Sequence, residues 1–262
     1  MEIDLNADLG EGFGCYRMGN DEALMSIISS ANVACGYHAG DPVTMERMSK
    51  LALAGGIDLG AHVGFHDLMG FGRREMQVEP SELASQVLYQ LGALAGIARA
   101  VGHRVTHLNF HGALGAMAGV NYALANSLLR AIAAFDPSII ISVSANTKIE
   151  LAARANGMRV ATMFLADRAY DDEGNLVSRK ISGSVILDSQ IVLERVDRYL
   201  DTGHIETITG KLLKLEADSI LLHGDTPGAV ESAQAIRQLI ETNGGNIVPI
   251  SRILARRDEL QR

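Results

Sequence analysis

The chain has 262 residues, 47% of them hydrophobic and 21% charged, a composition that can bury a full core and excludes a disordered or fibrous protein. Its 23 Lys and Arg against 31 Asp and Glu give a net charge of −8 without a dense basic stripe, so neither a nucleic acid nor an anionic membrane is expected as a partner. No apolar run reaches the ~18 residues of a membrane span, and the N-terminus lacks the features of a signal peptide, so we expect a cytoplasmic protein.

Seven short apolar segments predict β-strands, and segments with helical periodicity alternate with them. The predicted strands are Glu2–Asn6, Asn32–Cys35, Gly56–Ala61, Arg104–Asn109, Pro137–Val143, Met158–Phe164 and Ser219–Leu222. The predicted helices are Asp21–Ile28, Val43–Leu53, Glu79–Gly102, Asn121–Ala134, Thr147–Ala155, Asp188–Tyr199 and Ala229–Glu241. We further expect a short edge segment at Asn246–Ile250 and an exposed helix at Arg252–Arg262.

Six of the seven predicted strands end in a charged or imidazole side chain beside a glycine, and the fifth ends in Ser144 and Asn146. Any one such residue is more often a helix cap or a satisfied polar group. Together they are hard to explain as structure, because burying titratable groups is costly unless they pair, bind a metal or act on a substrate. The candidate site residues are Asp8, Glu11, His38, Asp41, His62, His111, Asp167, Arg168, His223 and Asp225.

The stretch from Ser30 to Pro42 shows this pattern most clearly. An apolar strand breaks into Gly, His and Asp and then meets a proline suited to the first turn of a helix. A polar loop with a helix-capping Asp41 is the simpler interpretation of this stretch alone. If the functional interpretation holds, His38 and Asp41 should face Asp8 and His62 across a shared cavity.

The remaining histidines give weaker signals. His62 and His66 have the spacing of a helical metal pair, but the glycines around them make a helix implausible. His103 and His107 are interpreted as surface and packing residues, because only His111 stands at a strand end before a helix.

Alternation of strands and helices predicts a parallel sheet with right-handed crossovers, which brings all the strand C-termini to one side. Closure into a barrel makes the polar side chains converge, whereas an open doubly wound sheet would gather only those near its switch point. We therefore predict a single domain over residues 1–262, a distorted seven-stranded parallel (β/α) barrel with its site at the C-terminal rim.

Carboxylates and histidines at such a rim are suited to hydrolysis or acyl transfer. Asp8 and His38 are the leading candidates for activating water, and Arg168 for stabilising an oxyanion or phosphate. A divalent metal, if present, could be held by Asp8, His38 and His62. The sequence has no nucleophile-elbow motif that would support a catalytic serine.

Six segments spread over the chain closely resemble the LamB/YcsF family: Asp4–Gly14, Ala31–Pro42, Gly70–Arg74, His111–Leu114, Ala166–Tyr170 and His223–Val230. The resemblance implies a seven-stranded barrel related to glycoside hydrolases and deacetylases. The best-understood activity in that family is an ATP-dependent 5-oxoprolinase. In it, B and C subunits activate 5-oxoproline by phosphorylation, and the family member hydrolyses the activated ring to glutamate.

Three of the motifs depart from the expected family pattern. Asn109 and Phe110 stand where Lys and Pro are expected, Gly115 where Tyr is expected, and Met163 where Glu is expected. His66 stands where a proline is usual. Because these changes lie at strand ends or their loops, three alternatives stay open: a hydrolase acting on another lactam or cyclic amide, a metal-dependent deacetylase-like hydrolase, and a non-catalytic scaffold. A homo-oligomer is also possible.

Overall fold

Seven parallel strands close into a barrel in the computed structural model, which describes residues 1–260. The strands are β1 (Glu2–Leu9), β2 (Ser30–Ala34), β3 (Asp58–Val63), β4 (Val105–Phe110), β5 (Ile140–Ser144), β6 (Val160–Leu165) and β9 (Ser219–His223). Each pairs with the next, and β1 closes the ring by pairing with β9 from Asp4 opposite Ser219 to Asp8 opposite His223. The seven-stranded parallel barrel predicted from the sequence is confirmed.

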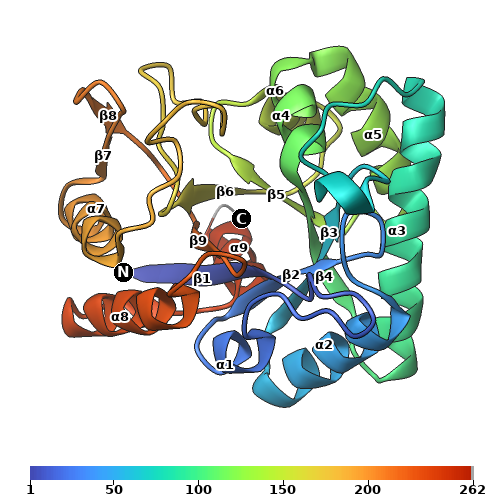
Figure 1. The fold of residues 1–262 in the computed structure, drawn as a ribbon, viewed down its shortest axis with the longest axis horizontal. Coiled ribbons are helices and arrows are strands. Elements are labelled where there is room, and N and C mark those ends of the chain that lie inside the picture. The colour runs from blue at the N-terminus through green and yellow to red at the C-terminus, as the bar shows by residue number, and fades with distance from the viewer. Residues whose placement is uncertain (261–262) are drawn as a thin grey trace.

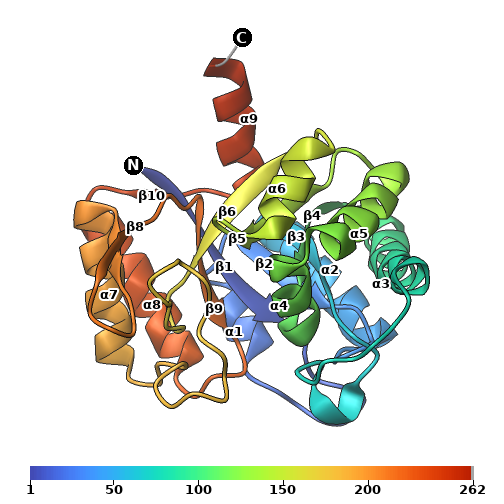
Figure 2. The ribbon, with the colours of Figure 1, turned by 90° about the horizontal axis from the view of Figure 1, so that it is seen from above.

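Helices surround the barrel (Figure 1). They are α1 (Asp21–Met25), α2 (Pro42–Gly55), α3 (Pro80–Ala100), α4 (Gly112–Val120), α5 (Tyr122–Phe135), α6 (Lys148–Ala155), α7 (Ser189–Thr202), α8 (Ala229–Thr242) and α9 (Ile250–Leu260), with a 3₁₀ turn η1 (Leu68–Gly70). Figure 2 shows α9 projecting from one end of the barrel. The loop between β6 and α7 lies toward the opposite end. No helix in residues 1–260 is long and apolar enough to cross a membrane.

The structure adds two elements that the sequence did not predict. Helix α4 was missed because Gly112, Gly115 and Gly119 weaken its helical pattern. A hairpin of β7 (His204–Glu206) and β8 (Leu212–Lys214) was missed because each strand has only three residues. The expected edge segment is β10 (Asn246–Ile247), which pairs with β1. The tail helix is α9, and residues 261–262 lie outside the described part of the chain.

Alternation along β1 separates two environments. Ile3, Leu5, Ala7 and Leu9 belong to the main apolar core, together with helix residues such as Leu24. The residues between them are polar and also buried: Asp4, Asn6 and Asp8. The barrel interior is therefore polar along this strand.

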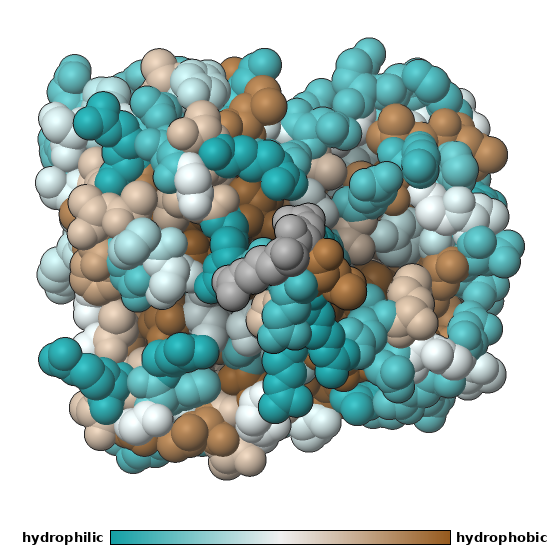
Figure 3. Space-filling model, turned by 180° about the vertical axis from the view of Figure 1, so that it is seen from behind, coloured by the Kyte–Doolittle hydropathy of each residue, from teal (hydrophilic) through white to brown (hydrophobic). Residues whose placement is uncertain are grey.

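The end of the barrel away from the strand C-termini is closed by α9. Ile250 and Leu254 pack on Ile140 of β5 and Ala161 of β6. Beside them, the backbone N–H of Ile250 donates to Ser30 Oγ. Figure 3 shows hydrophilic side chains spread over the face from which α9 projects, with smaller hydrophobic areas between them.

Asp4 lies at this closed end, where Ser29, Ser30 and Ser219 each donate a hydroxyl hydrogen bond of 2.6 Å to its carboxylate. Burial raises the pKa of Asp4 from 3.8 to about 7, although the serine hydrogen bonds act in the opposite direction. The protonated carboxyl is thus the form that the folded state favours.

This raised pKa predicts a pH dependence of stability. The contribution of Asp4 is full below about pH 4 and is lost as the pH rises through about 7, since the unfolded chain holds the proton less tightly. In urea unfolding, the wild type should lose up to about 4 kcal/mol relative to Asp4→Asn between about pH 4 and pH 8. Parallel stability curves for the two proteins would contradict this prediction.

Candidate active site

The carboxyl ends of four strands deliver buried polar side chains to one region. Asp8 lies next to the last residue of β1, His62 lies near the end of β3, His111 follows β4 directly, and the partly buried His223 ends β9. The loops after β1 and β2 add Glu11 and His38, which are also buried. The predicted convergence therefore brings six of the candidate residues together, and Asp167 joins them through His223.

Glu11, His38, His62 and His111 form a tight group, here called the imidazole cluster. Each offers a donor atom, and these atoms lie within 4.8 Å of one another. His62 Nε2 is 2.9 Å from His111 Nδ1, and Glu11 Oε1 is 3.4 Å from His38 Nε2. The rings of His38 and His111 stack with centroids 3.7 Å apart and planes within 4°. Such a set of neutral imidazoles and a carboxylate can hold a divalent cation.

Burial controls the charge of the cluster. Burial lowers the pKa of His38 to about 3 and lowers the pKa values of His62 and His111 well below their usual range. Arg73 and the other imidazoles nearby lower these pKa values further. Burial also raises the pKa of Glu11 well above its usual value, with further contributions from Asp8 and Asp225. The imidazoles are therefore uncharged at neutral pH, which is the form that ligates metals.

A second group links Asp167, His223 and Asp8. His223 Nδ1 lies 2.9 Å from Asp167 Oδ1, and His223 Nε2 lies 3.9 Å from Asp8 Oδ2. Burial alone would lower the pKa of His223, but the two carboxylates raise it above its usual value. Burial raises the pKa of Asp8 to about 6, against a lowering by His223 and Asn32. The arrangement therefore favours the protonated form of His223, with Asp167 on one side and Asp8 on the other.

Asp8 is held by hydrogen bonds to residues of the barrel interior that were not among the predicted site residues. Its Oδ1 accepts a 2.9 Å hydrogen bond from Asn32 Nδ2, and Asn32 Oδ1 is 2.9 Å from His107 Nε2. Thr106 Oγ1 then lies 2.9 Å from His107 Nδ1. His107, interpreted from sequence as a surface or packing residue, is a fully buried member of this chain. The sequence signal that could have identified His107 is its spacing of two residues from Asn109, which places both side chains on the same face of the strand.

Two candidates lie outside both groups. Asp41 caps α2 by accepting from the N–H groups of Val43 and Thr44, and its other oxygen accepts from Gly14 N–H. The expectation that Asp41 faces Asp8 and His62 is therefore corrected, and the simpler interpretation of a helix cap describes it.

Arg168 is also occupied elsewhere, since its guanidinium donates to the backbone carbonyls of Ser184 and Val177. These bonds fix the loop between β6 and α7. A cation that does lie at the edge of the site is Arg73, which pairs with the remaining candidate, Asp225, at 2.7 Å and lies over the ring of Phe71. The predicted metal ligand Asp8 is likewise replaced by Glu11 and His111 in the group of candidate ligands.

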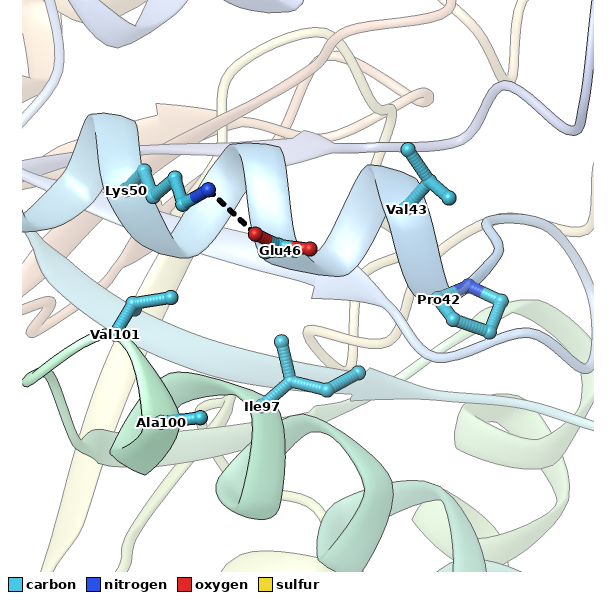
Figure 4. Close-up of a pocket in the computed structure, with 7 residues that line it drawn as sticks. All are labelled: Pro42, Val43, Glu46, Lys50, Ile97, Ala100 and Val101. Carbon is cyan, nitrogen blue, oxygen red and sulfur yellow. Dashed lines mark hydrogen bonds and ion pairs between the residues drawn. The ribbon is translucent and has the colours of Figure 1, made fainter.

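A surface groove of about 630 Å³ lies between α2 and α3. Its charged side chains, Glu46 and Lys50, pair with each other (Figure 4). The other lining residues are Pro42, Val43, Ile97, Ala100 and Val101. None of them is a candidate catalytic residue, so this groove is separate from the titratable groups at the barrel rim.

Fold and site together define an α/β barrel protein with titratable groups gathered at the carboxyl ends of its strands. The chain belongs to the LamB/YcsF family, which matches residues 3–255. A protein of Ralstonia nicotianae, named as the second of its 5-oxoprolinase A subunits, is 61% identical over 254 residues, which are 97% of this chain and 98% of that protein.

Two solved structures resemble the barrel. The lactam utilization protein of Thermus thermophilus superposes with a TM-score of 0.89 at 39% identity, covering 95% of this chain and 99% of that one. A peptidoglycan deacetylase of Bacillus subtilis, PdaC, gives a TM-score of 0.50 at 15% identity, covering 99% and 92%. The second likeness shows the fold alone, and it agrees with the predicted deacetylase type of barrel.

The close packing of His107 against Gly60 predicts the effect of a side chain at position 60. A Cβ on Gly60 would lie 2.1 Å from His107 Nε2, so Gly60→Ala should displace the imidazole and reduce the free energy of unfolding by roughly 1–3 kcal/mol. Gly92→Ala in α3 is the matched control: the nearest atom to its Cβ is 4.0 Å away, and it should stabilise by up to about 1 kcal/mol. Equal stabilities of the two variants in urea would count against the buried position of His107.

Proposed function

We propose that this chain is the A subunit of an ATP-dependent 5-oxoprolinase and hydrolyses the activated lactam ring of 5-oxoproline to glutamate. The observation that carries the proposal is the 61% identity, over nearly the whole length of both chains, to a protein named as a 5-oxoprolinase A subunit. The word subunit in that name implies a complex. B and C subunits are the partners we propose, and we place the complex in the cytoplasm.

Opening a lactam requires an attacking water and a proton for the departing nitrogen. Asp8 Oδ2 faces His62 at 3.4 Å and His223 at 3.9 Å, while Asp8 Oδ1 is held by Asn32. We assign Asp8 as the base that takes the proton of water as its oxygen bonds to the ring carbonyl carbon. His223, whose protonated form Asp167 stabilises, donates to the ring nitrogen as the C–N bond breaks. If the former carbonyl oxygen carries the phosphoryl group, this step leaves an acyl phosphate, which a second water hydrolyses to glutamate and inorganic phosphate.

ATP consumption belongs to the partner subunits in this proposal. The glycines after β1 are poorly placed for a dinucleotide loop, because they do not open a helix. Arg73, at the edge of the site beside Asp225, is suited to hold the carboxylate or phosphate of an activated substrate. The lactam would thus arrive activated, and this chain would supply only the hydrolytic groups.

Reconstitution tests this function. The chain mixed with B and C subunits, ATP and 5-oxoproline should release glutamate, and omission of any one component should stop the release. Asp8→Asn should assemble into the complex but lose at least ~10²-fold in kcat. An intact complex that releases no glutamate would exclude the proposal.

A second candidate is hydrolysis of another cyclic amide by a similar complex. The specific observation is that two departures from the expected family pattern meet in the barrel, where Asn109 Nδ2 lies 3.5 Å from Met163 Sδ. A lysine and a glutamate at these positions would form an ion pair, so the exchange removes one charge of each sign beside the site. Release of product from other lactams, but not from 5-oxoproline, would favour this candidate.

The pairing of Asp167 with His223 predicts a pH effect. A general acid is active below its pKa, and its activity is lost as the pH rises through that value. In Asp167→Asn the pKa of His223 should fall, because a carboxylate that raises it is gone. The alkaline limb of the kcat profile should therefore move to lower pH, with kcat reduced by ~10²-fold. Glu173→Gln, an exposed change in the same loop, should leave the profile unchanged.

A further inference from the structure

We propose that Glu11, His38, His62 and His111 bind one divalent transition-metal ion, for which Zn²⁺ is the best match. Three imidazoles and one carboxylate are ligands that Zn²⁺ and its first-row neighbours favour over Mg²⁺ or Ca²⁺. This inference goes beyond the proposed lactam hydrolysis, because the isolated chain should bind the ion whatever its substrate is.

The spacing of the donor atoms fits such an ion. Ligands about 2.1 Å from a tetrahedral metal lie roughly 3.4 Å from one another. In the imidazole cluster, His62 and His111 approach to 2.9 Å, Glu11 and His38 to 3.4 Å, and Glu11 and His111 to 3.8 Å. These three distances are within about 0.5 Å of ligand spacing, and no two of the four donor atoms are more than 4.8 Å apart.

The backbone around His111 sets its tautomer. His111 Nε2 lies 2.8 Å from the carbonyl oxygen of Phe71, which can only accept, so Nε2 carries the hydrogen. His111 Nδ1 then presents its lone pair to His62 and Glu11. A metal-bound histidine ordinarily donates its other nitrogen to a carbonyl or carboxylate in this way.

His38 supplies the second, independent observation. It is fully buried, and among the described residues neither of its ring nitrogens has a hydrogen-bond partner; His62 Nδ1 also has none. Each such buried polar atom costs about 1–3 kcal/mol. An ion between His38 and Glu11 would satisfy one of these nitrogens.

The stacked rings indicate which ligand moves. An imidazole holds a metal near its own plane, so two parallel rings cannot both point at one ion. His111 is fixed by Phe71, whereas no hydrogen bond from any residue in 1–260 holds the ring of His38. We therefore infer that the ring of His38, and not that of His111, rotates out of the stack when the ion binds.

The glycine backbone at Gly64 and Gly72 packs closely against the imidazole cluster. A Cβ on Gly72 would lie 2.7 Å from His38 Cβ and 2.8 Å from His111 Cδ2, and one on Gly64 would lie 2.8 Å from His38 Nδ1. Four protein ligands around an enclosed tetrahedral ion would leave no open position, which is the pattern of a structural metal site.

Metal analysis of the full chain tests the inference directly. The purified protein is stripped with a chelator, dialysed, and titrated with Zn²⁺ and with Co²⁺. We expect about one equivalent of either ion to bind, with visible Co²⁺ bands of nitrogen and oxygen ligation and a Zn²⁺-dependent rise in Tm. Glu11→Gln, His62→Ala and His111→Ala should each weaken Zn²⁺ binding by more than about 100-fold.

His66→Ala is the matched control, because this exposed imidazole lies four residues from His62 and outside the cluster. It should bind Zn²⁺ like the wild type. Glu11→Gln is nearly isosteric, so it separates loss of a ligand from loss of folding, and circular dichroism checks each variant. A stripped wild type that takes up neither ion, or a folded Glu11→Gln and His62→Ala that bind as tightly as the wild type, would overturn the proposal.

Discussion

The pairing of β1 with β9 is the constraint on which the site depends. It closes the sheet, so that Asp8 at the end of one strand lies opposite His223 at the end of the other. In an open sheet these two strands could lie at opposite edges, and the Asp8–His223 contact would be lost. Closure also buries both residues, and burial is the leading influence on their pKa values. Closure of the barrel therefore determines both the relative position of Asp8 and His223 and the shifts of their pKa values.

Closure also imposes a cost, because the barrel interior carries polar side chains from end to end. The structure meets this cost with hydrogen bonds at two levels: the serines around Asp4 at the closed end, and the chain from His107 through Asn32 to Asp8 higher up. At the rim, ring nitrogens of His38 and His62 find no hydrogen-bond partner in the described part of the chain, and the buried side chains of Asn6 and Ser142 also lack one. In the imidazole cluster the unpaired nitrogens lie within 4.8 Å of other donor atoms, so one bound ligand could satisfy them there.

Much of the fold could be predicted because β-strands and helices alternate with clear periodicity, and because polar residues mark the strand ends. The same signal identified Asp8, His62, His111 and His223 correctly as neighbours. It could not distinguish Asp41, whose position before a proline suits a cap as well as a catalyst. Nor could it reveal Arg168 bound to distant carbonyls, or the contact of Asn32 with His107, because such partners depend on strand register and loop paths.

The proposed chemistry takes place at the barrel rim between Asp8, His223 and the imidazole cluster. A crystal structure of the chain with 5-oxoproline bound tests this most directly. We expect the lactam carbonyl to lie within hydrogen-bond reach of these groups, with the carboxylate of the ligand directed to Arg73. A lactam bound in the groove between α2 and α3, with the rim residues contacting only one another, would contradict the account.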